Sequence, residues 1–195
     1  MSLTLVTPPS AEPVALADAK AFLRVEHSAD DALIEEFLVA ARRRYDGRDG
    51  MLGRALVTQV WQMRLDTFPA GEIEVPLPPL QSIDSVSYEA EDGTTAALTE
   101  GTDFRVDSWS APGRIVPVNG WPKTAKVPGA VTIEFTAGYG GPADVPNQLT
   151  TAILQTIGTW YDTSRSSVVV DMGRPRTVPQ TGDDLARDFK VAWEF

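Results

Sequence analysis

The sequence predicts an α+β protein in which a small helical bundle, built from the N- and C-terminal parts of the chain, carries an inserted antiparallel β region. Apolar residues recur every three or four positions near both ends of the chain, whereas short alternating runs fill the middle. Of the 15 prolines, 10 lie between Pro69 and Pro146, so the strands of the middle part are expected to be short. Short, interrupted strands favour an antiparallel sheet over a parallel one.

The N-terminal part, residues 1–54, is expected to be helical. Pro13 opens a short helix, and Ser28 stands where it would cap a second helix that starts near Asp31. Three arginines at 42–44 come late in the second helix, where cations complement the helix dipole, and the glycines that follow end it. The apolar faces of the two helices comprise Leu16, Ala19, Phe22 and Leu23, then Leu33, Ile34, Phe37, Leu38 and Ala41.

Residues 55–140 are expected to form the inserted β region, because apolar and polar residues alternate there. The alternation is clearest in the runs 61–65, 73–77 and 131–135. A period of two with valine, isoleucine and aromatic residues is typical of half-buried strands. Glu91-Asp92-Gly93 is typical of a hairpin turn between two such strands.

Residues 141–163 are expected to form a third helix that completes the bundle. Asp144 is placed to cap it, with Pro146 in its first turn. The first two helices are too short to bury their apolar stripes alone, so the third helix is their expected partner. We expect the following side chains to be buried together: Leu33, Phe37, Leu38, Ile153, Ile157 and Trp160.

Residues 164–195 are expected to form a C-terminal arm and a terminal helix. The arm has too few apolar residues to build a core of its own. In the terminal helix, large apolar residues recur at i, i+4 and i+8, and such a face needs a cover, either on its own chain or on a neighbour. We therefore expect a partner interface at these residues: Arg174, Arg176, Leu185, Phe189, Trp193 and Phe195.

The charge of the chain argues against nucleic-acid binding. The formal net charge is −10, and residues 65–104 contain nine acids and no lysine or arginine. A nucleic-acid interface needs a basic surface that releases counterions. No apolar run approaches the roughly 20 residues that span a bilayer, and the first residues do not resemble a signal peptide, so we expect a cytoplasmic protein.

The sequence predicts no catalytic, cofactor or metal site. The chain contains no cysteine, and its single histidine, His27, stands in a predicted loop without the residues of a catalytic triad or metal centre. The glycine-rich segment 138–141 lacks the lysine of a phosphate-binding loop, which favours a tight turn. Trp109 and Trp121 fall in loops rich in glycine and proline, where each could anchor a protein interface or a carbohydrate.

Several local motifs, in this order, resemble a known family. The chain resembles the tailed-phage head–tail connector proteins of the gp6-like and phiE125 gp8-like families, also called adaptor or head-completion proteins. The resemblance covers roughly residues 5–165, and two features depart from the pattern: the family often has an acid where this chain has Arg43 and Arg44, and the tail beyond Ser164 is variable in the family. The residues that carry the resemblance are 12–20, 22–25, 30–34, 40–42, 53–61, 65–69, 77–83, 137–140 and Val145-Pro146.

The resemblance implies a structural subunit and not an enzyme. In the family, copies assemble into a ring beneath the portal protein, usually with twelvefold symmetry. The ring extends the DNA channel without binding DNA specifically, offers a docking surface to the neck or tail completion protein, and has no cofactor and no membrane contact. The resemblance also implies that the protein lies in the neck of a virion, prophage particle or gene-transfer particle, and that it is present in the bacterial cytoplasm during assembly. Two alternatives remain: a ligand- or carbohydrate-binding β module that uses the loop tryptophans, and a hydrolase with an unrecognised carboxylate pair.

Overall fold

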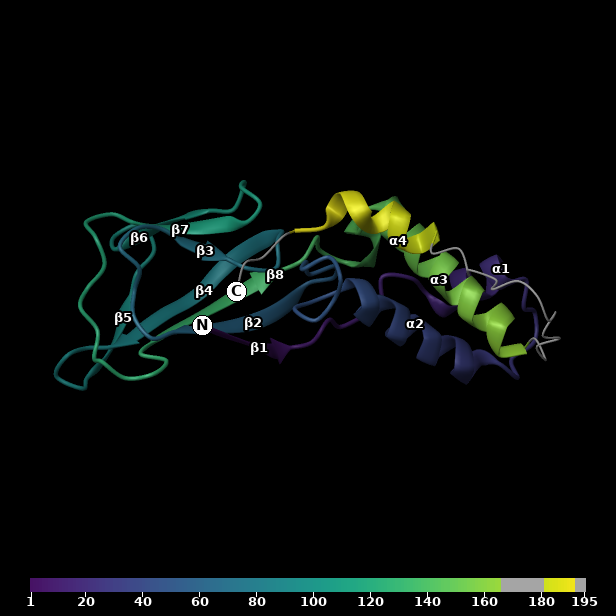
Figure 1. Cartoon of the computed structure of the whole chain (residues 1–195), viewed down its shortest axis with the longest axis horizontal. Coiled ribbons are helices and arrows are strands. Elements are labelled where there is room, and N and C mark those ends of the chain that lie inside the picture. The colour runs from purple at the N-terminus through teal and green to yellow at the C-terminus, as the bar shows by residue number, and fades with distance from the viewer. Residues whose placement is uncertain (166–180, 192–195) are drawn as a thin grey trace, which may run out of the picture.

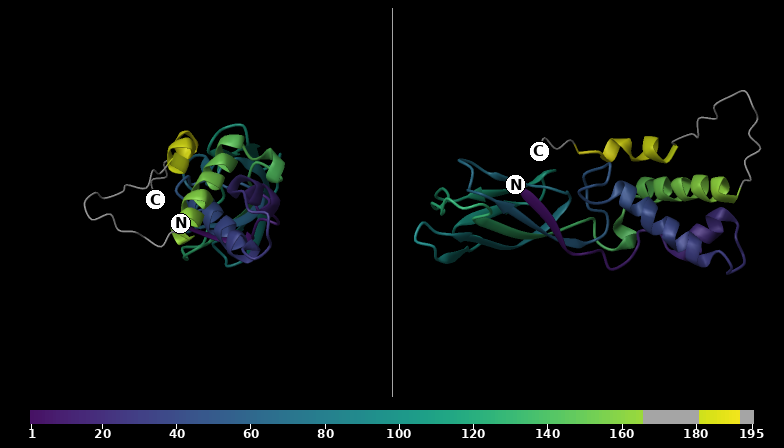
Figure 2. Two further views of the ribbon diagram at one scale, coloured as in Figure 1. Left: turned by 90° about the vertical axis from the view of Figure 1, so that its right-hand side faces the viewer. Right: turned by 60° about the horizontal axis from the view of Figure 1, so that its bottom comes forward.

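A computed structural model of the chain describes residues 1–165 and 181–191. The molecule is elongated, with the helical part at one end of its long axis and the β part at the other (Figure 1; Figure 2). The predicted fold class is confirmed: N- and C-terminal helices pack together, and antiparallel sheets are inserted between them. The elements of the helical part are α1 (Leu16–Leu23), α2 (Asp31–Tyr45), η1 (Pro142–Asp144), α3 (Asn147–Arg165), α4 (Thr181–Ala186) and η2 (Arg187–Phe189). Those of the β part are β1 (Ser2–Thr7), β2 (Gln59–Leu65), β3 (Ile73–Val75), β4 (Leu80–Glu89), β5 (Thr95–Leu98), β6 (Phe104–Asp107), β7 (Gly113–Pro117) and β8 (Val131–Ala137).

The helical core forms where α2 meets α3, as predicted. Leu38 on α2 is buried against Ile153 and Ile157 on α3. Phe37 and Trp160 lie at the edge of this core, where their rings meet edge to face with centroids 6.0 Å apart. The apolar faces of α2 and α3 therefore pack against each other and join the two helices into one unit.

Leu33 does not belong to the buried stripe that the sequence predicted for it. It is 36% exposed, whereas its neighbour Ile34 is fully buried. The buried side of α2 includes Ile34, Leu38 and Tyr45. Leu33 precedes Ile34 by one position, and one position on a helix is a rotation of about 100°, so its side chain points away from this buried side. Phe22 is also exposed, at 47%, and lies over Gly158 of α3 at the surface of the bundle.

Two of the predicted helix caps are wrong. Asp30, not Ser28, occupies the N-cap position of α2, and its carboxylate accepts a hydrogen bond from the Tyr161 hydroxyl at 2.6 Å. Asp144 belongs to the short turn η1, where it accepts a hydrogen bond from the N–H of Gly141 at 2.8 Å, and α3 begins only at Asn147. Neither carboxylate makes a capping hydrogen bond to the following helix: that of Asp30 accepts from Tyr161, and that of Asp144 accepts from the N–H of Gly141 within the turn η1.

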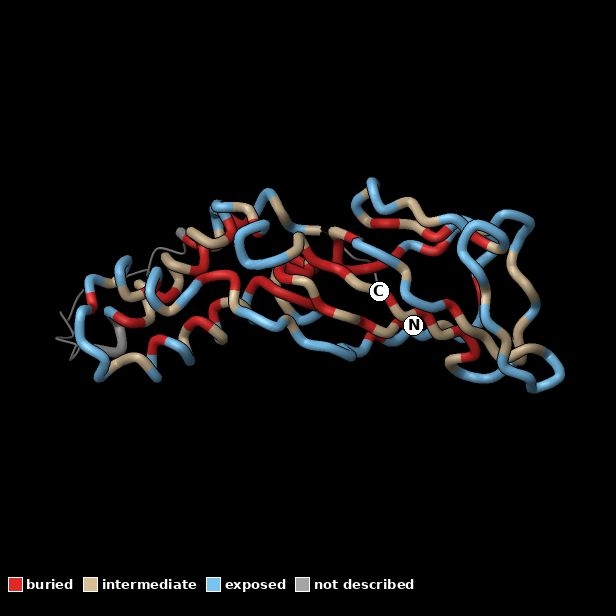
Figure 3. The backbone as a smooth tube through the Cα atoms, turned by 180° about the vertical axis from the view of Figure 1, so that it is seen from behind, coloured by how far each residue is buried: buried red, intermediate tan, exposed pale blue. Residues whose placement is uncertain are grey.

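The β part consists of a five-stranded sheet in the order β1-β2-β8-β4-β5 and a three-stranded sheet in the order β3-β7-β6. All pairs are antiparallel. Their facing sides enclose a second core around Met63, Ile115, Ile133 and Phe135, all fully buried. The turn at Glu91-Asp92-Gly93 joins β4 to β5, as predicted. Buried backbone continues from this core into the helical one (Figure 3).

The first strand, β1, was not predicted, and it joins the N-terminus to the β part. Ser2–Thr7 pairs with β2, more than fifty residues later in the chain. Leu3 is the only buried residue of this strand and contacts the β core. The chain therefore enters the sheet before it forms the first helix.

A buried polar cluster joins the end of α2 to the start of β2. The Asp46 carboxylate is 7% exposed and accepts hydrogen bonds from the N–H of Leu56 at 2.8 Å, from Nε2 of Gln59 at 2.9 Å and from Arg42 at 2.8 Å. Gln59 in turn accepts a hydrogen bond from the indole N–H of Trp61. Burial lowers the pKa of Arg42, but hydrogen bonds to Glu12 and Asp46 outweigh burial and raise it. The cluster thus fixes the helices relative to the sheet.

Candidate assembly surfaces

The last described segment of the chain, residues Thr181–Val191, lies along α3 and the end of α2 (Figure 1). We call these residues the C-terminal strap. Ala186 of the strap is fully buried in the helical core. A Cβ atom added at Gly182 would lie 2.7 Å from the carbonyl oxygen of Ala152 and 2.8 Å from the Tyr45 hydroxyl oxygen. Only glycine permits this approach of α4 to α3.

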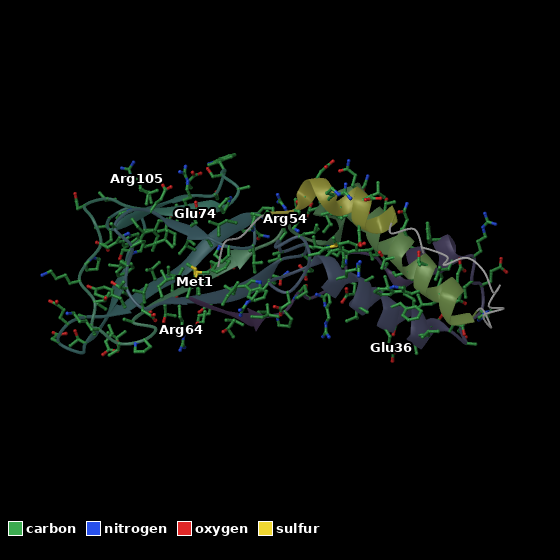
Figure 4. The ribbon with its side chains drawn as sticks, in the orientation of Figure 1. Met1, Glu36, Arg54, Arg64, Glu74 and Arg105 are labelled. Atoms are coloured by element: carbon green, nitrogen blue, oxygen red, sulfur yellow. The ribbon has the colours of Figure 1, made fainter. Side chains whose placement is uncertain are left out.

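Polar contacts hold the strap at both of its ends. Asp183 accepts hydrogen bonds from Arg44 at 2.9 Å and from the Tyr45 hydroxyl at 3.0 Å, and the hydrogen bond from Arg44 lowers its pKa. Farther along, Arg54 donates to the carbonyl oxygen of Phe189, and the N–H of Val191 donates to the carbonyl oxygen of Leu52 at 2.9 Å. Arg54 lies between the helices and the strands (Figure 4), so the strap reaches the junction of the two parts.

The predicted interface residues have different positions in the structure. Leu185 is 37% exposed, whereas Phe189 is half-buried against the helical core. Their predicted common face is wrong, because α4 ends at Ala186 and continues as the tighter turn η2. Gly182 and Ala186, four residues apart, form the buried side of α4 instead. Arg174, Arg176, Trp193 and Phe195 lie outside the described residues.

The two loop tryptophans differ from each other. The Trp121 ring stacks on Phe68, with centroids 4.7 Å apart and an interplanar angle of 4°, and its indole N–H donates to the carbonyl oxygen of Gly71. Trp121 therefore packs at the edge of the β core, and Phe68 covers one face of its ring. Trp109, in contrast, is 97% exposed in the loop between β6 and β7. Of the two anchors that the sequence suggested, Trp109 is therefore the fully exposed one, and Trp121 is partly buried.

A network of hydrogen bonds fixes the turn that presents Trp109. The Asp107 carboxylate accepts from the N–H groups of Trp109 and Ser110 at 3.2 Å each, and from Arg114 at 2.7 Å. Arg114 also pairs with Glu72 on the neighbouring part of the sheet. Hydrogen bonds from Arg114 and Ser110 lower the pKa of Asp107 to about 2. An exposed aromatic on such a preorganised turn is typical of an interface anchor.

The edge of the five-stranded sheet formed by β1 is a candidate surface that sequence reasoning missed. Leu5 and Val6 on β1 are 41% and 48% exposed. Alternation of apolar and polar residues over positions 2–5, followed by two prolines, is the signal that could have revealed this strand.

The contacts of Gly182 and Asp183 had no local signal in the sequence, because they depend on residues far away along the chain.

The described residues provide no metal-binding cluster. Across residues 1–165 and 181–191, no group of three or more histidine or acidic side chains could hold an ion. His27 is exposed in the loop before α2, as predicted, with Nε2 3.9 Å from the Asp30 carboxylate. Within the same residues, no helix is long and apolar enough to cross a membrane.

The fold matches chains in solved structures of gene transfer agent particles. No protein-family model matches the sequence, and no curated protein matches it. A chain from the neck of an empty gene transfer agent particle, computed with C6 symmetry, is 20% identical and superposes with a TM-score of 0.76. A chain from the virion of the native particle is 19% identical with a TM-score of 0.77, and one from the neck of the native particle, computed with C12 symmetry, is 17% identical with a TM-score of 0.70.

Each of these matches extends over 100% of this chain and 98% of the other. The likeness therefore includes the helices, both sheets and the order in which they are connected. At 17–20% identity it establishes the shared fold.

Proposed function

We propose that this protein is a structural, non-catalytic subunit of the head–tail connector ring of a tailed phage, prophage or gene-transfer particle. In this role it joins the portal to the neck or tail completion protein and extends the DNA channel. The observation that carries the proposal is the full-length likeness to chains from the neck of a gene transfer agent particle. The motifs that resemble connector proteins point independently to the same class.

The arrangement of charge supports a channel that DNA passes without specific binding. The chain has a net charge of −10, and exposed acids such as Glu74, Glu91 and Glu100 lie on the β part. Such acids repel a phosphate backbone over a Debye length of about 10 Å at 0.1 M salt. We expect no salt-sensitive binding of duplex DNA at micromolar protein concentration, and such binding in a filter or gel-shift assay would contradict this part of the proposal.

The attachment to portal is assigned to the C-terminal end of the chain. Leu185 leaves apolar surface exposed on the strap, which is itself anchored to the subunit through Asp183 and Ala186. The other residues that we assign to this contact lie outside the described residues: Arg174, Arg176, Trp193 and Phe195. The strap would thus present Leu185 at a defined place on the subunit.

Electron microscopy of the concentrated protein, alone and mixed with the portal protein of the same genome, tests the proposal. We expect rings, with twelve subunits when portal is present. A protein that remains monomeric at high concentration and in the presence of portal would refute it. Leu185→Glu should weaken binding to portal without changing the melting temperature, and Phe22→Glu, which alters a comparably exposed residue on α1, is the matched control.

A further inference from the structure

A groove lies between the two N-terminal helices and the beginning of α3. Its volume is about 850 Å³, which is within the range of known binding sites. Val14 and Leu38 line it and are buried, Leu154 lines it from α3, and the exposed residues Ala15 and Ala143 line it near the surface. The groove is therefore mainly apolar, and the described part of the chain leaves it open.

The groove and the C-terminal strap lie on different sides of α3. The strap approaches α3 at Ala152 and Thr156, whereas the groove is lined by Leu154. Two positions on a helix correspond to a rotation of about 200°, so Leu154 points to nearly the opposite side. The end-on view of Figure 2 shows α4 and α1 on different sides of α3. The strap thus covers one side of α3, and the groove exposes part of another.

Acidic side chains stand around this apolar surface. Asp18 on α1 and Glu35 on α2 both line the groove and are exposed. Among the described residues, neither of them forms an ion pair, whereas a third lining acid, Glu12, pairs with Arg42 at 2.7 Å. No lysine, arginine or histidine in the described part of the chain lines the groove. An occupant that complements it is thus apolar and positively charged.

This chemistry excludes several other occupants. DNA or an anionic lipid surface would be repelled by the acids. A small polar ligand would find one neutral side-chain hydroxyl in the described lining, that of Thr150. The strap is held on another side of α3 and carries acids of its own: Asp183, Asp184 and Asp188. A protein segment fits, because lysine and arginine carry their charge on long stems beside neighbouring apolar side chains.

We propose that this groove docks a segment of a partner protein in which a large apolar side chain stands close to lysine or arginine residues. The apolar side chain enters the groove between α1, α2 and α3, and the cations pair with Asp18 and Glu35. The choice of partner, the portal or a neck protein of the same particle, rests on the proposed function. The chemistry of the segment follows from the groove alone.

Overlapping peptides that cover the portal and neck proteins of the same genome test the proposal, with the full chain as the binding protein. The affinity of each bound peptide is then measured in solution from the fluorescence anisotropy of a dye on the peptide. We expect the bound peptides to combine a large apolar residue with nearby lysine or arginine. Their binding should weaken as the salt concentration rises, because the carboxylates of Asp18 and Glu35 are exposed.

Two pairs of variants separate the groove from the rest of the surface. Glu35→Lys should weaken peptide binding at least about tenfold, because it places a like charge beside the bound cations. Glu36→Lys makes the same charge change at the next position of α2, which is exposed and does not line the groove (Figure 4), and should leave binding unchanged. Ala15→Trp should also abolish binding by filling the groove, whereas Ala32→Trp, at an exposed position outside it, should not. All four positions are exposed, so the melting temperatures should stay close to that of the natural protein.

The outcomes distinguish the inference from the proposed function. Rings in the microscope without any peptide whose binding depends on Glu35 would overturn the docking groove and leave the connector function intact. Peptide binding that depends on Glu35 in a protein that forms no rings would support the groove and overturn the connector function.

Two other occupants are also outcomes of the test. Binding of a peptide of residues 166–180 that Glu35→Lys weakens would assign the groove to this chain's own segment. Self-association that Glu35→Lys abolishes would assign it to a second copy. Either result would overturn the docking of a partner protein.

Discussion

Replacing Asp46 by alanine should cost more stability than any other single charge removal in the described residues. Its carboxylate accepts three hydrogen bonds and joins α2 to the start of β2. The substitution leaves the N–H of Leu56 and one N–H of Gln59 without this acceptor in a buried site. Each unsatisfied donor costs about 1–3 kcal/mol, and Arg42 loses one of its two carboxylate partners. The expected loss is about 3–5 kcal/mol in the free energy of unfolding.

Urea denaturation followed by tryptophan fluorescence measures this loss. Trp61 is a local reporter, because its indole N–H donates to Gln59 of the same cluster. Asp49→Ala, which removes an exposed acid three residues away, is the matched control and should change stability by less than about 0.5 kcal/mol. A loss below about 1 kcal/mol for Asp46→Ala would refute the reasoning, since it would mean that water or a rearranged neighbour replaces the carboxylate at little cost.

Three further predictions concern the strap and the loop tryptophans. Gly182→Val should destabilise the protein by about 1–3 kcal/mol, because its side chain would overlap the backbone of Ala152; an unchanged thermal melting curve would contradict this. Asp183→Asn should lower stability by up to about 1 kcal/mol near neutral pH. Because the pKa of Asp183 is lowered in the folded state, its contribution is present above pH about 4 and is lost as the pH falls further, so melting curves of variant and natural protein should converge in acid and not at pH 7. Trp121→Ala should cost at least about 2 kcal/mol in chemical denaturation, whereas Trp109→Ala should stay within about 0.5 kcal/mol; equal losses would mean that the exposed ring is also part of the core.

The features that could be predicted from the sequence are those that depend on near neighbours. The spacing of Leu38 on one helix and of Ile153 and Ile157 on another identified the faces that pack together, since a helix repeats every 3.6 residues. Alternation identified β2, β3 and β8, and the Glu91–Gly93 turn identified the β4–β5 hairpin. Errors arose at the borders of these patterns, as at Leu33, where one residue of phase decides burial.

The candidate surfaces were less accessible to sequence reasoning. Apolar spacing near the C-terminus predicted a terminal helix with Leu185 and Phe189 on one face, whereas the structure has the short helix α4 followed by the tighter turn η2. The actual buried side follows Gly182 and Ala186, because the carbonyl oxygen of Ala152 and the Tyr45 hydroxyl lie too close to admit a larger residue at position 182. No periodicity in the last fifteen residues carries that information.

By itself, the sequence determined the helices that build the bundle, the alternating strands β2, β3 and β8, the insertion of the β region between helices, and the strongly acidic net charge, since these properties follow from local periodicity and composition. Only the tertiary structure decided that β1 pairs with β2, that Asp46 links the helices to the sheet, and that the strap closes over α3. Each of these contacts joins residues that are distant along the chain, and its free energy depends on a burial and a geometry that arise only once the elements have packed.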